Sequence, residues 1–367
     1  MIGRAIVKWV MMTANVAVAF SLLMTLLGSV LSPETFILPS YFALAFPLII
    51  GMNICFVIFW MLARKWFFIL SLSLLLFSTS QINDTHPFHL GKTKSVQARH
   101  PISILTYNTM MSGKLVKHTQ RKPNMVLQQI LDTDADIVCL QEFEVSTQDI
   151  YVTHADMLRI FSKYQYKHIW YKQSLSNKRY GLATFSKYPI VNKQHIDYPS
   201  ESNSSIFSDI VVDGTTIRVV NNHLESNRLT EKDKSMPVRL KNKFSAENLS
   251  GLTRHFSRKL GVAYKLRAHQ ADVVAGIIAD SPHKVVVCSD LNDVPTSYAY
   301  TRVKGKLKDA FSEIGTGFGW TFCEKFYRFR IDYVFYDPSF SAVKLVVNPV
   351  KYSDHYPVLC YLKIKEE

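Results

Sequence analysis

Residues 285–292 have the sequence VVVCSDLN, an apolar run that stops abruptly at Asp290. Four small or β-branched apolar residues in succession are typical of a short strand that is buried on both faces. The polar residues that end such a strand, Asp290 and Asn292, would then lie at one edge of a sheet. The run therefore predicts a sheet-based domain with a polar site at one edge.

Other β-rich runs lie on both sides of this strand, with a few helical stretches between them. The predicted strands are 102–107, 137–140, 180–186, 206–212, 216–222, 284–289, 331–336 and 358–364, and the predicted helices are 123–132, 147–161 and 267–280. Many strands with few intervening helices indicate an α+β fold or a layered sandwich, and not a strictly alternating parallel sheet.

Polar residues gather at the ends of several of these strands. Asn108, Glu142 and His223 each follow a strand in the same way as Asp290, Asp332 lies within another, and the pair Asp354 and His355 precedes the last. Any one of them is a common turn former or helix cap. Seven such positions in one domain favour convergence on a single cleft.

The residue types in this set predict a particular chemistry. Carboxylates and an amide are hard oxygen ligands that suit Mg²⁺ or Mn²⁺, and the five cysteines include no CxxC pair that would suggest zinc. A His paired with an Asp can exchange a proton with a phosphoryl group while a carboxylate activates water. The set therefore suits hydrolysis of a phosphate ester.

The motifs and their order resemble the endonuclease/exonuclease/phosphatase superfamily over residues 102–364. The stretches that carry the resemblance are ILTYN at 104–108, LQE at 140–142, YGLATFS at 180–186, NNHL at 221–224, SDLN at 289–292, RIDY at 330–333 and SDH at 353–355. Each is weak alone, but seven in order are strong evidence. The family includes DNase I-like nucleases, abasic-site endonucleases, neutral sphingomyelinases and inositol polyphosphate 5-phosphatases.

The resemblance implies a fold and a role for each residue. The fold would be a DNase I-like four-layer α/β sandwich, two packed β-sheets flanked by helices. Glu142 would be the main metal ligand, with Asn108 beside it and Asp354 near a second or alternative metal position. Asp290 would orient or deprotonate the attacking water and Asn292 would hold it, while His355, held by Asp332, and His223 would contact the phosphate. Ser289 departs from the Gly that is usual before the Asp, but a small residue remains.

The first 82 residues differ sharply in composition from the rest, because Glu34 is their only acidic residue. The runs 6–31 and 41–62 are apolar and long enough to cross a hydrocarbon core of about 30 Å, and 66–82 is a shorter third candidate. A cleaved signal peptide is the alternative for the first run, but its apolar core is normally shorter. We therefore expect a multi-pass anchor, with residues 83–100 as a polar linker and 101–367 as the catalytic domain.

Basic residues predict the orientation of this anchor. Arg4 and Lys8 precede the first run and Arg64 and Lys65 follow the second, whereas the loop between the two runs has no basic residue. The N-terminus and the second loop should then be cytoplasmic. Three spans would place the catalytic domain outside the cytoplasm, in the periplasm of a Gram-negative bacterium, and two spans would place it inside. We expect three.

A formal net charge of +14 indicates an anionic partner, and much of this charge lies between residues 226 and 269, where eleven Lys or Arg face three acidic residues. Arg239, Lys241 and Lys243 are the predicted substrate-binding cations. The segment would follow a nucleic-acid backbone in a nuclease, or face anionic lipid in a phospholipid, sphingomyelin or inositol-phosphate phosphoesterase. A solvated insertion without a ligand is the third interpretation. The sequence identifies no protein partner.

Overall fold

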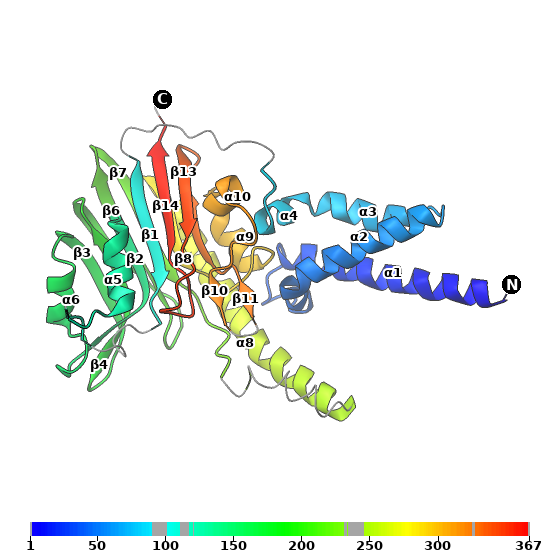
Figure 1. Ribbon diagram of the computed structural model, residues 1–367, viewed down its shortest axis with the longest axis horizontal. Coiled ribbons are helices and arrows are strands. Elements are labelled where there is room, and N and C mark those ends of the chain that lie inside the picture. The colour runs from blue at the N-terminus through cyan, green and yellow to red at the C-terminus, as the bar shows by residue number, and fades with distance from the viewer. Residues whose placement is uncertain are drawn as a thin grey trace. The chain divides into compact units, whose positions relative to one another are not determined.

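A computed structural model describes residues 2–89, 101–110, 117–119, 121–230, 233, 246–324 and 327–365 (Figure 1). The chain falls into two compact units. One combines Met1–Thr85 with Ser226–His269 and Val294–Arg302, and the other comprises the remaining segments. The first is called the anchor unit here and the second the sheet unit.

The sheet unit contains two six-stranded sheets. The first sheet has the order β13-β14-β1-β2-β4-β3 and the second β5-β6-β7-β8-β12-β9. The strands are β1 Ile102–Asn108, β2 Ile137–Ser146, β3 Tyr166–Ser174, β4 Lys178–Ser186, β5 Ile190–Ile196, β6 Ser204–Val212, β7 Thr215–His223, β8 Lys284–Asp290, β9 Lys308–Asp309, β12 Asp332–Tyr336, β13 Phe340–Val347 and β14 Val358–Ile364. A separate hairpin pairs β10 Phe322–Cys323 with β11 Arg328–Phe329. Because β1 pairs with β2, and β7 with β8, in parallel, both sheets are mixed.

The two sheets pack against each other through their apolar faces. Ile104, Cys139 and Cys360 of the first sheet share one core with Val286 and Val334 of the second. Free cysteines behave as small hydrophobes in such a core, and Cys288 lies there as well, as its apolar strand predicts. Burial of this apolar surface is the main force that holds the sheets together.

Helices flank the sheets. α5 Met125–Thr133 and α6 His154–Ile160 bury Leu127 and Met157 against the first sheet, and α10 Ala310–Ile314, which follows β9, buries Ala310 in the core that the two sheets share (Figure 1). The expected architecture of two packed sheets flanked by helices is confirmed.

Two predicted helices differ from the structure. The observed helix α6 is shorter than the predicted helix 147–161, because β2 continues to Ser146 and a turn follows. Thr153 then caps α6 in a reciprocal pair with Asp156, which fixes the start of the helix. The predicted helix 267–280 is the end of a much longer one, α8 Ala246–Ala279, and α9 Tyr298–Lys304 follows β8.

The anchor unit contains the apolar helices. α1 Ile2–Gly28 leads into the 3-10 helix η1 Leu38–Ala45 and α2 Phe46–Leu62, then into α3 Phe68–Phe77 and α4 Thr79–Thr85. Two stretches, Ala5–Gly28 and Leu38–Leu62, are long and apolar enough to cross a membrane, whereas α3 alone, at 10 residues, is about 15 Å long. The predicted linker therefore begins inside α4, and its residues 90–100 lie outside the described chain.

Polar side chains of this bundle lie between the helices. Asn15 on α1 donates a hydrogen bond to Ser71 Oγ on α3 (2.9 Å) and accepts one from Trp60 Nε1 on α2 (2.7 Å). Asn53 is fully buried and donates to the Ile49 and Val18 carbonyls. Many large apolar side chains, such as Ile54, are instead exposed. The interior of the bundle thus combines polar side chains with apolar ones such as Leu22, and its outer surface is apolar.

Candidate active site

Three predicted residues of the second sheet lie in one row because of the strand register. β7 and β8 pair in parallel with His223 opposite Asp290, and β12 and β8 pair antiparallel with Asp332 opposite Asp290. Asp290 is fully buried in the middle of this row. His223 Nε2 lies 3.7 Å from Asp290 Oδ2. The edge site that the run 285–292 predicts is therefore present.

The first sheet contributes Asn108, the last residue of β1, and Glu142, which lies inside β2 and not after its end as predicted, because β2 continues to Ser146. Asn108 Nδ2 donates to Asp290 Oδ2 (2.8 Å), a contact from one sheet to the other, and also approaches Glu142 Oε1 at 3.4 Å. Glu142 Oε1 lies 3.9 Å from His223 Nε2. The two sheets therefore place four of the predicted residues around one point.

A β-bulge sets the direction of Glu142. The register between β2 and β4 shifts between Leu140 and Phe143, and Glu142 adopts a left-handed backbone conformation with φ of 51°. Bulges of this kind redirect a side chain relative to the regular pleat, and a non-glycine residue in this region is strained. Asn292, just after β8, has φ of 52° as well. Both strained residues belong to the predicted site.

His355 and Asp332 form a buried pair. His355 Nδ1 lies 2.8 Å from Asp332 Oδ2, which leaves Nε2 facing Asp290 Oδ2 at 3.8 Å. Burial alone lowers the pKa of His355, but the carboxylates of Asp332 and Asp290 outweigh burial and raise the pKa well above its ordinary value. The imidazole is therefore held as a cation at neutral pH.

Two buried polar atoms of the site residues lack hydrogen-bond partners among the described residues. They are His223 Nε2 and Asp332 Oδ1. A buried polar atom in this state is destabilising unless a ligand satisfies it. Beside Glu142, Asn108 and Asp290, which offer oxygen atoms, the site fits a divalent cation with a phosphate.

A second potential ligand group consists of Asp290, Asp332 and His355, whose ligand-type atoms lie within 4.8 Å of one another. Asp332 and the Nδ1 atom of His355 already bind each other in this group. These two atoms are therefore already occupied by each other, whereas the carboxylate of Glu142 is not part of this pair.

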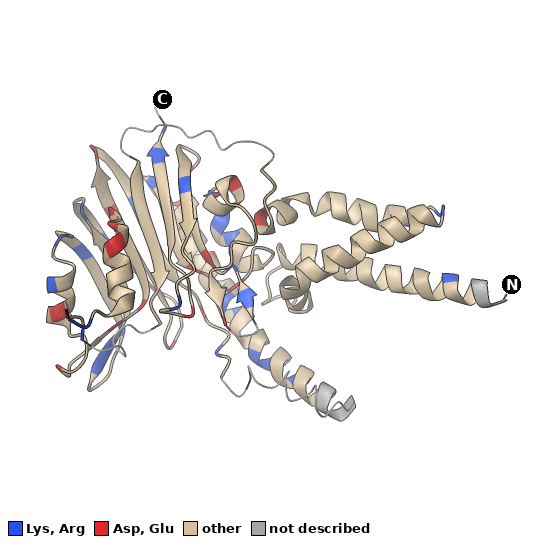
Figure 2. Ribbon diagram, in the orientation of Figure 1, with Lys and Arg blue, Asp and Glu red and all other residues tan. Residues whose placement is uncertain are grey.

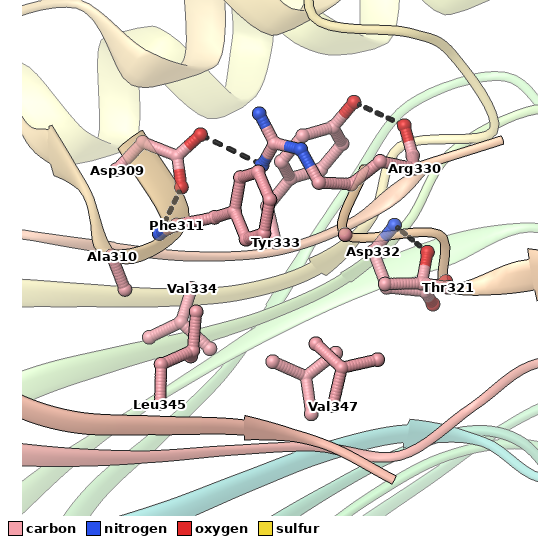
Figure 3. A pocket seen from close by; sticks show the side chains of 12 residues that line it. Asp309, Ala310, Phe311, Thr321, Arg330, Asp332, Tyr333, Val334, Leu345 and Val347 are labelled. Carbon is pink, nitrogen blue, oxygen red and sulfur yellow. Dashed lines mark hydrogen bonds and ion pairs between the residues drawn. The ribbon is translucent and has the colours of Figure 1, made fainter. Parts of the chain in front are cut away.

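A layer of supporting residues lies behind Asp332, around a small cavity (Figure 3). Arg330 pairs with Asp309 at 2.8 Å, and its guanidinium lies over the rings of Phe311 and Tyr333. Thr321 Oγ1 accepts hydrogen bonds from the backbone amides of Ile331 and Asp332, both at 3.0 Å. These contacts fix β12 and so the position of Asp332.

The sequence interpretation did not assign a role to these supporting residues. Arg330 was visible only as part of the RIDY motif, and Thr321 had no signal of its own. The same holds for Ser353, which donates to the Asn108 carbonyl (2.9 Å) and contacts Asp354 Oδ1 (3.2 Å). Ser353 thereby ties the loop before β14 to the end of β1.

The structure brings together most of the predicted site. Asn108, Glu142, His223, Asp290, Asp332 and His355 form a connected cluster, Asn292 joins it through its backbone N–H to Asp290 Oδ1 (2.8 Å), and Asp354 adjoins it through Ser353. Arg239, Lys241 and Lys243 lie outside the described residues, so their predicted role stays a prediction.

The chain belongs to the Endonuclease/Exonuclease/phosphatase family, whose profile matches residues 105–355. Proteins of this family are hydrolases of the phosphoesterase type and generally depend on divalent metals, so the chain is a phosphoesterase-type hydrolase. Residues 8–85 match a domain of unknown function. A search of curated proteins found no match.

Solved structures show the same fold. An endonuclease/exonuclease/phosphatase from Beutenbergia cavernae DSM 12333 is 18% identical, with a TM-score of 0.51 and 72% of each chain covered. TDP2 from D. rerio, complexed with a single-strand DNA product, is 14% identical, with a TM-score of 0.50, and the alignment covers 72% of this chain and 100% of that one. At these identities the likeness concerns the fold alone.

Proposed function

We propose that the chain is a membrane-anchored, Mg²⁺-dependent phosphodiesterase, with nucleic acids and phospholipid headgroups as the two candidate substrates. The observation that carries this proposal is the cluster in which Asn108, His223 and His355 all face the buried carboxylate of Asp290. A nuclease and a lipid phosphodiesterase would cleave the same type of bond, so the residues of the site suit both. A panel of substrates therefore separates the two.

Asp290 is placed to accept the proton of an attacking water. Its Oδ1 receives the backbone N–H of Asn292 (2.8 Å) and its Oδ2 receives Asn108 Nδ2 (2.8 Å). These two donors fix the plane of the carboxylate, so that the remaining lone pairs point into the site. General-base action of this kind contributes about 10² to 10⁴ in rate.

His355 supplies positive charge and a proton donor on the other side. Because Asp332 binds Nδ1, the Nε2–H of the imidazolium is directed at the reacting phosphate, where it would stabilise the charge that develops on oxygen. His223, with its unpartnered Nε2, would bind another phosphate oxygen. The leaving alcohol would take its proton from His355, the proton donor on this side of the site.

Glu142 and Asn108 would hold the cation, with Asp354 near a second or alternative position. A bound Mg²⁺ or Mn²⁺ would neutralise phosphate charge and polarise its oxygens. The strained conformation of Glu142 supports this role, because such strain is retained where a side chain must be presented in one direction.

The proposal is tested on the full-length chain in detergent. Bis-p-nitrophenyl phosphate, a small soluble diester that resembles neither candidate substrate, serves as the probe of the chemistry. Hydrolysis should disappear with EDTA and return with Mg²⁺ or Mn²⁺, and Glu142→Ala should raise the Mg²⁺ concentration that is needed. Plasmid DNA, RNA, sphingomyelin and phosphoinositides would then be compared. Activity that survives exhaustive chelation would remove the mechanism.

The apolar outer surface of the bundle supports membrane anchoring. In the two long apolar stretches only about a quarter of the residues are buried, 28% and 22%, whereas the core helix of a soluble protein is mostly buried. The buried Asn15 side chain bonds Ser71 and Trp60, and Asn53 Nδ2 donates to the backbone, which is how polar groups are accommodated between helices in lipid.

Contacts within the anchor unit also support the three-span topology. Lys8 lies over the ring of Phe67, so the start of α1 and the α2–α3 turn with Arg64 and Lys65 share one end of the bundle, where Figure 2 shows basic residues. Ile82 of α4 packs with Phe46 near the opposite end. α3 and α4 together therefore run back along α2, which their combined length allows although α3 alone is too short.

This arrangement has a consequence for sidedness. The basic end should be cytoplasmic, and the end with η1 should then be extracytoplasmic. Tyr41 on η1 donates to the Ser257 carbonyl on α8, and Thr296 donates to the Ala43 carbonyl, so segments of the catalytic sequence lie on the η1 side. We propose an extracytoplasmic catalytic domain. Alkaline phosphatase fused at the C-terminus should be active, and an active cytoplasmic reporter there would contradict the topology.

The same contacts refine the proposed domain division. Residues 1–82, 83–100 and 101–367 remain the proposed anchor, linker and catalytic domain, but Ser226–His269 and Val294–Arg302 associate with the anchor helices. The insertion that follows His223 is therefore part of the anchor unit in space, although it is part of the catalytic domain in sequence.

A further inference from the structure

The first half of α8 has one exposed face. Arg254, Arg258, Val262 and Lys265 are exposed and follow each other at intervals of four, four and three residues, which places them on the same side of a helix. Val262, in the middle, is 58% exposed. We call these four residues the basic stripe.

The cations of this stripe differ from their neighbours in having no acidic partner among the described residues. Lys259 and His255, on the adjoining side of the helix, both pair with Asp233. Asp233 is buried and the positive neighbours lower its pKa, so it stays ionised and neutralises them. The charge of Arg254, Arg258 and Lys265 therefore remains available to an external anion.

The opposite face of this half of α8 is fixed to η1. Tyr264 is buried and meets the Tyr41 ring edge-on at 5.8 Å, and the Tyr41 hydroxyl donates to the Ser257 carbonyl at 2.8 Å. A Cβ atom at Gly261 would lie only 2.7 Å from that hydroxyl, so glycine permits the close approach. The helix has one side bound to the anchor and the other side free.

We propose that the basic stripe binds the headgroups of anionic phospholipids in the bilayer that holds the anchor. The proposal rests on the membrane anchoring proposed above. η1 begins the second long apolar stretch, Leu38–Leu62, and so lies where the chain enters the membrane. A helix packed on η1 is about 10 Å across, so its free face lies at the level of the headgroups. Each Lys or Arg near an anionic surface contributes about 1 kcal/mol.

Nucleic acid is the other polyanion that a basic helix can bind, but the stripe is poorly suited to it. Single-strand binding relies on aromatic rings on which bases stack. The rings near the stripe are turned away from it, since Tyr264 is buried and Phe256 is half-buried, and the exposed apolar residue is Val262. An aliphatic residue between cations is instead typical of helices that lie on a lipid surface.

The test places a fluorescent label in the stripe of the full-length chain in nanodiscs. Val262→Cys is labelled with bimane after Cys55→Ser and Cys323→Ser, and phosphatidylcholine with a nitroxide on its headgroup acts as quencher. The matched control is Val191→Cys on β5, which is 63% exposed. We expect several-fold stronger quenching at Val262, increasing further when one quarter of the lipid is phosphatidylglycerol. Quenching no stronger than at Val191 would overturn the proposal.

A second label separates this proposal from the anchoring on which it rests. The native Cys55 is exposed on α2, so in the Cys323→Ser chain it reports the anchor through quenching by a nitroxide on the acyl chain. No quenching at Cys55 would refute the anchoring. Quenching at Cys55 together with none at Val262 would overturn only the role of the stripe.

Charge reversal tests the cations themselves. Arg254→Glu with Arg258→Glu and Lys265→Glu should abolish the increase that phosphatidylglycerol causes at Val262. An equal change in charge at three exposed lysines of the sheet unit, Lys122→Glu with Lys193→Glu and Lys344→Glu, should preserve it. Binding of a single-stranded oligonucleotide, measured by anisotropy, should respond equally to both sets. A selective tenfold loss of oligonucleotide affinity in the stripe variant, with the lipid effect intact, would overturn the proposal in favour of nucleic acid.

Discussion

The anchor helices and the sheet unit differ most in the side chains of their outer surfaces. Between α1, α2 and α3 the buried residues include Asn15, Asn53 and Ser71 beside apolar ones such as Leu22, and large apolar side chains face outward. Between the two sheets the core is mainly apolar, apart from buried polar contacts such as Asn221–Gln141, and polar side chains gather at one edge. On the proposed membrane anchoring, the two regions therefore face different solvents.

On the proposed membrane anchoring, different forces stabilise the two regions. Water drives apolar surface together, so the sheets gain stability from the burial of residues such as Ile104 and Val286. Lipid exerts no such force between helices, so the association of helices within a membrane depends on close packing and hydrogen bonds. The edge carboxylates of the sheet unit lie outside its apolar core.

The largest expected effect concerns this edge. His355→Ala and Asp290→Asn should each lower kcat on bis-p-nitrophenyl phosphate by at least about a hundredfold, because general acid and base groups contribute 10² to 10⁴. Asp332→Ala should lower it less, since Asp332 orients the imidazole without meeting the substrate. Thermal unfolding and circular dichroism would establish that the variants remain folded.

A different outcome would change the assignment. If Asp332→Ala lowered kcat as much as Asp290→Asn in a folded chain, Asp332 would have to contact the reacting group directly. If the His355→Ala variant retained most of the activity, the phosphate contact would have to be assigned to His223 instead.

The second prediction compares the outer surfaces of the two regions. Ile54 on α2 is 44% exposed and Val191 on β5 is 63% exposed, so a soluble protein would tolerate a lysine at either. Ile54→Lys should instead destabilise insertion by about 3 kcal/mol if the helix faces lipid. Val191→Lys should change stability by less than about 0.5 kcal/mol. Carbonate extraction of membranes measures the first and thermal unfolding the second.

Equal tolerance of both lysines would contradict the membrane interpretation of the bundle, because only a lipid surface distinguishes the two positions. Expression level and the activity per molecule of recovered protein serve as the control for general misfolding.

The third prediction concerns His168, a titratable group between the sheets. It is buried, with Nδ1 3.0 Å from Ser208 Oγ, and burial lowers its pKa from 6.5 to about 4. The unfolded chain therefore binds a proton below pH 6.5 that the folded chain excludes until about pH 4. Stability should fall as the pH falls through this window, by about 3 kcal/mol in total at about 1.4 kcal/mol per unit.

His168→Asn should flatten this dependence, although it also removes some packing. The unfolding temperature of the full-length chain in detergent, measured from pH 7.5 to pH 4, gives the slope for both proteins. An unchanged slope in the variant would assign the acid sensitivity to other groups.

Much of the fold was predictable because the central strands are strongly apolar. All eight predicted strands are present, and the long strands that were missed, β3, β5 and β13, each lie at the edge of a sheet. Edge strands have one side in solvent and accept charges, so β3 and β5 lack the apolar run or alternation that identifies a strand. In β5, the sequence IVNKQHI shows this directly.

The site was predictable as a set of residues but not as a geometry. The strand register that puts His223 and Asp332 opposite Asp290 depends on pairings between segments far apart in the sequence. The bulge at Glu142 and the support of β12 by Arg330 and Thr321 arise from packing between elements. None of these features can be recognised from the local sequence.

The apolar helices were predicted from composition, yet their association with the segment after His223 was not. Residues 226–269 have the charge of a solvated insertion, and only the structure shows Tyr41 against Ser257 and Tyr264. The contact involves a hydroxyl, a carbonyl and a glycine, which are too ordinary to be recognised as a motif.

The smallest expected effect tests the comparison at the level of one residue type. Asn15 bridges Trp60 and Ser71 in the bundle, and Asn221 bridges Gln141 and the Ala183 carbonyl between the sheets. Polar contacts between helices in lipid contribute only about 0.6 to 2 kcal/mol each. Asn221→Leu would leave several buried groups unpaired in a rigid core, at about 1 to 3 kcal/mol for each group. Asn15→Leu should therefore lower the unfolding temperature of the full-length chain slightly, and Asn221→Leu substantially. Leucine is as apolar as the lipid, so a bundle that faces a membrane can tolerate the loss of the polar bridge at Asn15. Equal decreases in unfolding temperature at the two positions would instead mean that both regions are stabilised in the same way.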